Sequence, residues 1–402
     1  MTDPTGAGAG TGPGYASGVP GRNERMKKII KRIALILGGL LGGLILFLTL
    51  GTMISSRLVS TPPFRDSAGK VIPNSIASLE EVELGKVKQT LLIRGRSMDD
   101  PVLLYLHGGP GSTELPLVRH YNSVLEDHYV VVLWDQRGAG KSYSLFLDSK
   151  TLTIDRILQD THELVELLRK RFNKKKIYLV GHSWGSMLGL ATAHKYPELL
   201  YAYIGIGQAI DFQEGERLSL QYTLQQARET KNEKAVKELE GLKDYPALND
   251  HWISDVLTER KWLGQFGGVM YGKKGMQDLF LVKRPPEFTL FDFVPFALGS
   301  VRSLKSLWPQ ILQYGDFRKI APELEVPVYF VTGRHDYNVP FALVEEYFQM
   351  VKAPRKRMVW FEQSAHMPNF EEPGKFNQFM INTVLQETYS ASERHGRSGT
   401  KR

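Results

Sequence analysis

Short apolar runs and longer stretches with helical spacing alternate along most of the chain. The runs predict buried strands at 82–94 (a pair), 101–106, 129–134, 176–180, 201–206, 326–331 and 356–361. The stretches between them, 115–125, 154–171, 186–195, 341–351 and 375–388, repeat apolar residues every three or four positions. Strands that alternate with amphipathic helices are typical of α/β architecture.

This rhythm is interrupted between 211 and 320. The segment contains aromatic-rich, helix-like pieces at 218–227, 233–242 and 252–263, and no clear core strand. The pattern therefore predicts a first core half at 55–210, a helical cap at 211–320 and a second core half at 321–390.

The two ends of the chain differ from this body. Residues 1–32 and 391–402 are polar and basic and are expected to be disordered. The 22 residues of 33–54 carry no charge, and as a helix they would measure about 33 Å, close to a bilayer core. Basic residues precede this run, so we expect a single membrane span with a cytoplasmic N-terminus and an extracytoplasmic catalytic domain. A cleavable signal peptide is the alternative, although no small-residue cleavage site is evident after the run.

Composition removes several classes of function. The 402 residues are 42% hydrophobic and 23% charged, as in globular proteins, and include no cysteine. The net charge is +8, but 1–32 contributes +4 and 391–402 contributes +3, which leaves +1 for the rest. A nearly neutral body does not predict nucleic-acid binding. The zinc motif HExxH and the phosphate loop GxxxxGK[ST] are absent, so no metal and no cofactor is expected.

A candidate nucleophile follows the predicted strand 176–180. Gly181-His182-Ser183-Trp184-Gly185 matches G-x-S-x-G between a strand and a small-residue helix, the context in which this motif exposes a serine. The sharp turn would place the Ser183 hydroxyl at the helix N-terminus, where backbone N–H groups favour developing negative charge.

A serine needs a base, and the base needs an orienting carboxylate. His366 lies just beyond the last predicted strand, and Asp336 follows the strand 326–331. The order Ser183, Asp336, His366 is that of α/β hydrolases. A turn-forming or helix-capping role is the alternative for Asp336. His335 is expected to be structural, and His182 to point away from the site.

A glycine loop supplies the other expected element. His107-Gly108-Gly109-Pro110-Gly111 ends the strand 101–106, and its glycines would let the backbone approach a ligand. We expect the N–H groups of Gly109 and Trp184 to form an oxyanion hole. A plain Gly/Pro turn is the alternative.

Together these motifs resemble the proline iminopeptidase family of α/β hydrolases. The resemblance rests on HGGPG (107–111), WDQRGAGKS (134–142), GHSWGS (181–186), GRHD and AHMP, and covers about 80–390. It implies a mostly parallel eight-stranded sheet, a helical cap and removal of N-terminal residues from short peptides. It also implies cap carboxylates that bind the substrate amine, for which Glu214 and Glu259 are the candidates, with Glu216 and Asp255 as further possibilities. His182 departs from the family's usual glycine.

The sequence therefore predicts a membrane-anchored serine hydrolase acting through an acyl-enzyme on Ser183. An aminopeptidase is favoured, and its partners would be short peptides or small acyl substrates. An esterase or lactonase on the same scaffold is the first alternative, and a non-catalytic surface-binding protein the second. The aromatic residues of the cap could select small apolar substrates or form its core; they are Tyr222, Trp252, Trp262 and Phe266.

Overall fold

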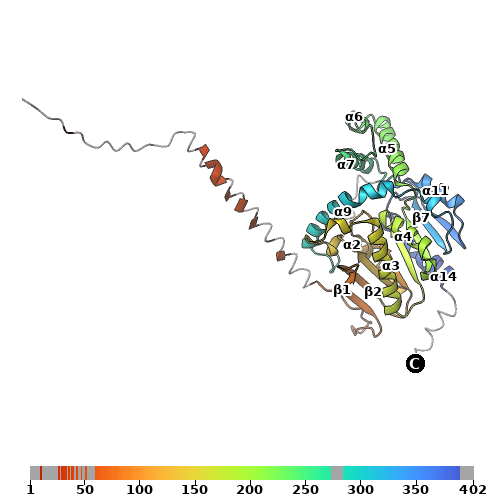
Figure 1. Cartoon of the computed structure of the whole chain (residues 1–402). Coiled ribbons are helices and arrows are strands. Elements are labelled where there is room, and N and C mark those ends of the chain that lie inside the picture. The colour runs from red at the N-terminus through yellow and green to blue at the C-terminus, as the bar shows by residue number, and fades with distance from the viewer. Residues whose placement is uncertain are drawn as a thin grey trace, which may run out of the picture. The chain divides into compact units, whose positions relative to one another are not determined.

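A computed structural model describes residues 59–272 and 284–389 without interruption. Before residue 59 it describes only positions 10, 26–27, 29–33, 35–36, 38–39, 42–43, 47 and 50–51. The chain divides into two compact units, Met1–Met53 and Ile54–Arg402. The second unit contains the sheet (Figure 1), and all the candidate site residues fall within its bounds.

The predicted membrane helix at 33–54 is only partly covered by the described residues. The described positions between 26 and 51 are helical, but much of 33–54 lies outside the described residues, as do most of 1–32 and all of 391–402. Among the residues that the structure describes, no helix is long and apolar enough to cross a bilayer. The membrane span therefore stays a prediction.

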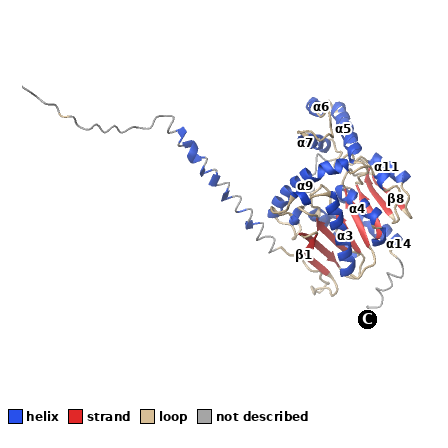
Figure 2. Cartoon of the chain, in the orientation of Figure 1, coloured by secondary structure: helices blue, strands red, loops and turns tan. Residues whose placement is uncertain are grey.

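An eight-stranded sheet forms the centre of the second unit (Figure 2). The strands lie in the order β1-β2-β4-β3-β5-β6-β7-β8. β1 pairs antiparallel with β2 and β2 with β4, and every pair from β4 to β8 is parallel. The expected mostly parallel, eight-stranded sheet is thus confirmed. The bounds are β1 Ile76–Leu84, β2 Val87–Gly95, β3 Val102–Leu106, β4 Val130–Asp135, β5 Ile177–His182, β6 Leu200–Ile206, β7 Val328–Gly333 and β8 Lys356–Phe361.

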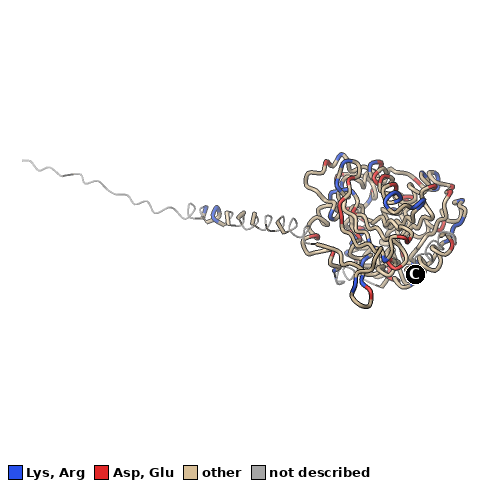
Figure 3. The backbone as a smooth tube through the Cα atoms, turned by 90° about the horizontal axis from the view of Figure 1, so that it is seen from below, with Lys and Arg blue, Asp and Glu red and all other residues tan. Residues whose placement is uncertain are grey.

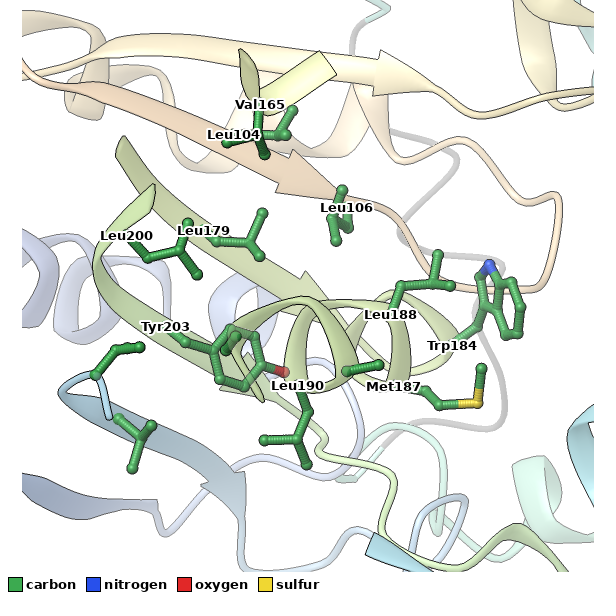
Figure 4. Close-up of a cluster of buried hydrophobic side chains, with 14 of the residues drawn as sticks. Leu104, Leu106, Val165, Leu179, Trp184, Met187, Leu188, Leu190, Leu200 and Tyr203 are labelled. Carbon is green, nitrogen blue, oxygen red and sulfur yellow. The ribbon is translucent and has the colours of Figure 1, made fainter. Parts of the chain in front are cut away.

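Helices cover both faces of this sheet because its central strands are apolar on both sides. Leu104 and Leu106 of β3 pack with α3 and α4 on one face (Figure 4), whereas Leu103 and Tyr105 pack on the other with α2 and the C-terminal helices. The helices outside the cap are α2 Leu115–Tyr121, α3 Ile154–Arg171, α4 Trp184–Lys195, α11 Phe341–Met350, α12 Pro368–Glu371, α13 Pro373–Phe379 and α14 Leu385–Thr388. Short 3-10 turns lie at η1 Ser123–Asp127, η2 Gly140–Ser142, η3 Ser149–Thr151 and η4 Pro197–Leu199, and the π-helical turn η6 at Met380–Val384.

In the described part of the segment between β6 and β7, every secondary-structure element is a helix. Its elements are α5 Phe212–Glu229, α6 Glu233–Glu240, α7 Trp252–Gln265, η5 Leu290–Asp292, α9 Phe293–Gln313 and α10 Phe317–Ile320. α5, α6 and α7 lie together away from the sheet (Figure 1). Buried residues of these three helices, including Ala227, Leu239 and Val256, form a separate apolar cluster together with Trp308 of α9. This arrangement fits the predicted cap at 211–320, whose limits as a domain stay a prediction.

Register brings the candidate loops together at one edge of the sheet. Leu106, at the end of β3, pairs with Gly181 near the end of β5. Ile206 of β6 in turn pairs with Val331 of β7. Loops that leave the carboxyl ends of neighbouring parallel strands meet at that edge, which is where open α/β sheets bind ligands.

Basic and acidic residues are intermixed along the described backbone of the second unit (Figure 3). This distribution agrees with the small net charge that the sequence leaves to the body once the two basic ends are set aside.

Candidate active site

Ser183 lies at the turn between β5 and α4 in a strained conformation. Its φ is 54° and its ψ is −119°, a region that side-chain-bearing residues rarely occupy. A Cβ on Gly181 would overlap the backbone oxygen of Gly185, and one on Gly185 would overlap the backbone oxygen of Leu106. The two glycines of the motif are therefore required by close backbone packing, as expected for a nucleophile elbow.

His366 and Asp336 form a buried pair beside this turn. Asp336 follows β7 and is fully buried, and its Oδ2 lies 2.9 Å from Nδ1 of His366. The other carboxylate oxygen, Oδ1, accepts the N–H groups of Asn338 at 3.0 Å and Val339 at 2.9 Å. These backbone bonds fix the carboxylate plane, so that Oδ2 is aimed at the imidazole.

Ser183 and His366 line the same cavity, which encloses about 320 Å³. The wall also includes Gly109 and apolar side chains from the core and the cap; these are Phe212, Val269, Trp308, Val339 and Met367. The three residues expected as a triad are therefore brought to one place from three loops far apart in the sequence.

The glycine loop after β3 lies against the elbow. A Cβ on Gly108 would come within 3.2 Å of the Ser183 Cβ, and Gly109 has a φ of 120°. Trp184 is the first residue of α4, where backbone N–H groups have no partner within the helix. This placement fits the expected oxyanion donors, whose role stays a prediction.

Gln136 joins the two segments that would form the oxyanion hole. Its Nε2 donates to the backbone oxygen of His107 at 3.1 Å, and its Oε1 accepts the indole N–H of Trp184 at 2.9 Å. The backbone N–H of Gln136 donates to Nε2 of His107 at 3.2 Å, and burial lowers the pKa of that imidazole. A neutral His107 and a bridging amide thus hold the loop and the helix at a fixed separation.

His182 does not point away from the site, and that expectation is wrong. It lines the cavity, where its Nε2 lies 2.9 Å from the backbone oxygen of His366 and its Nδ1 lies 2.6 Å from Oε1 of Glu114. A carbonyl only accepts, so Nε2 carries a proton. Glu114 already accepts from Tyr105 at 2.8 Å and from the N–H of Gly108 at 3.2 Å. These donors favour a Glu114 carboxylate and an imidazolium.

The pKa shifts of this pair agree with that assignment. Burial opposes both charges, but the attraction of Glu114 raises the pKa of His182. The same attraction outweighs burial at Glu114, whose pKa is lowered. The pair links the glycine loop to the backbone of the base, a connection that no single motif indicated.

The two carboxylates expected to bind a substrate amine are not at the cavity wall. Glu214 pairs with Arg318 at 2.9 Å outside the cavity. Glu259 is fully buried and accepts from Ser219 at 2.7 Å and Thr223 at 3.0 Å. Glu216, one of the further candidates, does line the cavity, because it lies on the face of α5 that is turned inward.

Glu216 belongs to a charged cluster with an excess of carboxylates. The Arg260 guanidinium, also at the cavity wall, binds both Glu216 and Glu259, and the Tyr245 hydroxyl donates to Glu216. Two carboxylates therefore share one guanidinium. Burial, together with the repulsion of Glu259, raises the pKa of Glu216 despite Arg260.

The cap aromatics of the sequence prediction serve packing. None of the four is a wall residue of the cavity. Trp262 is buried in the cap core, and Tyr222 stacks on Tyr337 with ring centroids 3.5 Å apart. Phe212 and Trp308 supply the aromatic surface of the cavity instead.

Comparison with known proteins identifies the family of this chain. The family model described as alpha/beta hydrolase fold matches residues 101–373. A Bacillus subtilis protein named probable aminopeptidase is 35% identical over 305 residues, which are 75% of this chain and 94% of that protein. The chain belongs to the proline iminopeptidase-like α/β hydrolases. It is a hydrolase of the serine peptidase type.

More distant relatives of this hydrolase agree with the family and the fold. A proline iminopeptidase from Heyndrickxia coagulans is 24% identical over 283 residues, covering 69% of this chain and 87% of that protein. The crystal structure of a proline iminopeptidase-related protein from Thermus thermophilus has a TM-score of 0.54 at 20% identity, covering 78% of this chain and 98% of that one. At that identity the structural likeness supports the fold alone.

Proposed function

We propose that this hydrolase releases N-terminal residues from short peptides through an acyl-enzyme on Ser183. Ser183 Oγ attacks the scissile carbonyl carbon while Nε2 of His366 takes the hydroxyl proton. The same imidazole then protonates the leaving amine, and water hydrolyses the ester. Asp336 orients His366, and the N–H groups of Gly109 and Trp184 receive the oxyanion. The observation that carries this proposal is the 2.9 Å pairing of His366 with the buried Asp336 beside a strained serine.

The charged cluster of the cap supports a substrate with a free amine. Glu216 and Glu259 share the single cation Arg260 at or behind the cavity wall. A second cation would offset the burial and the repulsion from Glu259, which together raise the pKa of Glu216. The protonated N-terminus of a peptide is such a cation, and relatives of this chain are named aminopeptidases and proline iminopeptidases. We therefore assign the amine site to Glu216.

The test compares prolyl- and alanyl-p-nitroanilides with their N-acetylated forms. We expect kcat/KM to be at least about 100-fold higher for the free amines, since a buried charged contact is lost on acetylation. Glu216→Gln should reduce this preference toward unity. Glu214→Gln is the matched control, because Glu214 lies outside the cavity, and should retain it. Equal turnover of the acetylated compounds would contradict the amine site, and rapid hydrolysis of p-nitrophenyl esters without amide turnover would establish an esterase or lactonase.

We also propose that residues 33–54 anchor the enzyme in a membrane with its catalytic unit on the extracytoplasmic side. The proposal rests on 22 uncharged residues preceded by four basic ones within 27–32. The full chain should remain in the membrane pellet after carbonate extraction, and a deletion of 33–54 should not. Release of the full chain by carbonate, or protection of the catalytic unit from protease added to spheroplasts, would contradict the anchor or its orientation.

A further inference from the structure

The loop that carries His366 is held by the carboxylate of a residue that follows it closely in the sequence. Glu371, the last residue of α12, accepts the backbone N–H of Ala365 at 2.9 Å and that of Met367 at 3.1 Å, both on Oε1. The two amides flank His366 directly. One carboxylate oxygen thus fixes the backbone on both sides of the base.

The other oxygen of Glu371 reaches a segment that follows the cap helix α7. Oε2 accepts the backbone N–H of Tyr271 at 2.7 Å. In the same segment, the oxygen of Val269 accepts the N–H of His366 at 3.0 Å, and that of Gly268 accepts the N–H of Tyr337 at 3.1 Å. The segment 268–271 therefore binds the backbone of both loops that supply the Asp–His pair.

We propose that Glu371 is a positioning residue that holds the His366 loop against segment 268–271 and so keeps the imidazole aligned with Ser183. The proposal rests on the proposed function, in which His366 is the base. It extends that function to a residue outside the cavity, which acts only through the backbone of His366. Because catalytic groups must be held within about 0.5 Å of the productive geometry, a small shift of this loop lowers the rate of the chemical step more than it weakens binding.

The clamp requires the carboxylate form. Three N–H donors converge on Glu371, and a protonated carboxyl would turn an O–H toward one of them. Burial raises the pKa of Glu371 to about 7, although the three backbone N–H groups act to lower it. The charge of Asp336 adds to the rise.

The other titratable groups around Glu371 have contacts of their own and do not take over its backbone hydrogen bonds. His366 is in the clamped loop, His335 stacks on Tyr271, and Glu372 binds the earlier residues Gln363 and Ser364. The clamp should therefore loosen as the pH falls through about 7.

The test is the pH profile of kcat and KM for the full chain with alanyl-p-nitroanilide, in the wild type and in Glu371→Gln. We expect Glu371→Gln to lower kcat about 10- to 100-fold at pH 8, with KM changed less than about twofold. In the wild type, kcat should fall as Glu371 takes up a proton near pH 7. In Glu371→Gln this contribution to the pH profile should be absent.

Two further variants make the result decisive. Glu362→Gln is the matched control, since Glu362 lies near the same loop but is exposed and pairs with the half-buried Arg334; it should match the wild type. Glu371→Asp keeps the charge with a shorter reach, so it should keep a carboxylate-dependent pH profile at an intermediate kcat. It serves as the main variant if Glu371→Gln does not fold. A wild-type kcat and pH profile in Glu371→Gln, or a pH profile in Glu371→Asp that matches that of Glu371→Gln, would overturn the clamp. If Ser183→Ala instead keeps full activity, the proposed function itself fails.

Discussion

Replacing Asp336 by asparagine tests the orientation of the base without changing the volume of a buried side chain. In the wild type, Oδ1 accepts two backbone N–H groups and Oδ2 faces Nδ1 of His366. The asparagine oxygen must take the place of Oδ1, because an NH2 group there would meet two donors. The NH2 group then faces His366 and forces Nδ1 to accept, so the ring proton moves to Nε2, the atom that must receive the proton of Ser183.

The size of the effect follows from this tautomer argument. The two backbone bonds are kept, so the loss is confined to one hydrogen bond and to the protonation state of the base. The equivalent change in the serine protease triad lowers kcat by about 10⁴, which corresponds to about 5.4 kcal/mol of activation free energy.

The assay is kcat with alanyl-p-nitroanilide at pH 8, accompanied by thermal unfolding to show that Asp336→Asn is folded. A folded variant that loses less than about tenfold in kcat would refute the role of Asp336, and with it the assignment of His366 as the base.

Three further changes test the surroundings of the triad. Gly185→Ala should lower the free energy of unfolding by about 1–3 kcal/mol in urea denaturation, because its Cβ meets the Leu106 oxygen. Gly374→Ala is the control and should not lower it, because its Cβ would meet open space. Equal stabilities of the two variants would contradict the packing argument. Gln136→Glu loses the donor to His107 and should lower kcat about 10-fold or more, with an unchanged rate arguing against the bridge. The pKa of His182 is raised above 6.5, so its pairing with Glu114 stabilises the fold fully below pH 6.5 and less as the pH rises through the folded-state value. His182→Asn should remove that pH dependence from the urea-unfolding free energy, and a dependence that persists would place its origin elsewhere.

Most of the sheet could be predicted from the sequence because its strands are short, continuously apolar runs. The runs at 101–106, 129–134 and 176–180 match β3, β4 and β5 to within one or two residues, and the helix predicted at 154–171 is α3. The pairing of the strands is not local information, so their number and direction came from the family resemblance. The sequence pattern does not predict the 21-residue helix α9 individually. Its sequence includes Gly299 and Pro309, which weaken the helical signal, whereas packing against the core stabilises it.

The candidate triad could also be predicted, since Ser183, Asp336 and His366 each follow a recognisable strand. The residues that hold them could not, because they act through the backbone of distant segments. Glu114 reaches His182 across 68 positions, and Tyr271 reaches Glu371 across 100. The sequence offers Glu214 and Glu259, with Glu216 and Asp255 as further possibilities, because it does not tell which face of a cap helix is turned to the cavity. Glu216, two positions beyond Glu214, has that orientation.

The most direct test of the central claim is covalent labelling of the full chain with a fluorophosphonate, followed by peptide mass spectrometry. The account predicts one modified site, at Ser183, with labelling lost in Ser183→Ala and slowed in parallel with kcat in Asp336→Asn. A folded protein that stays unmodified, or carries the adduct on another serine, would contradict the account.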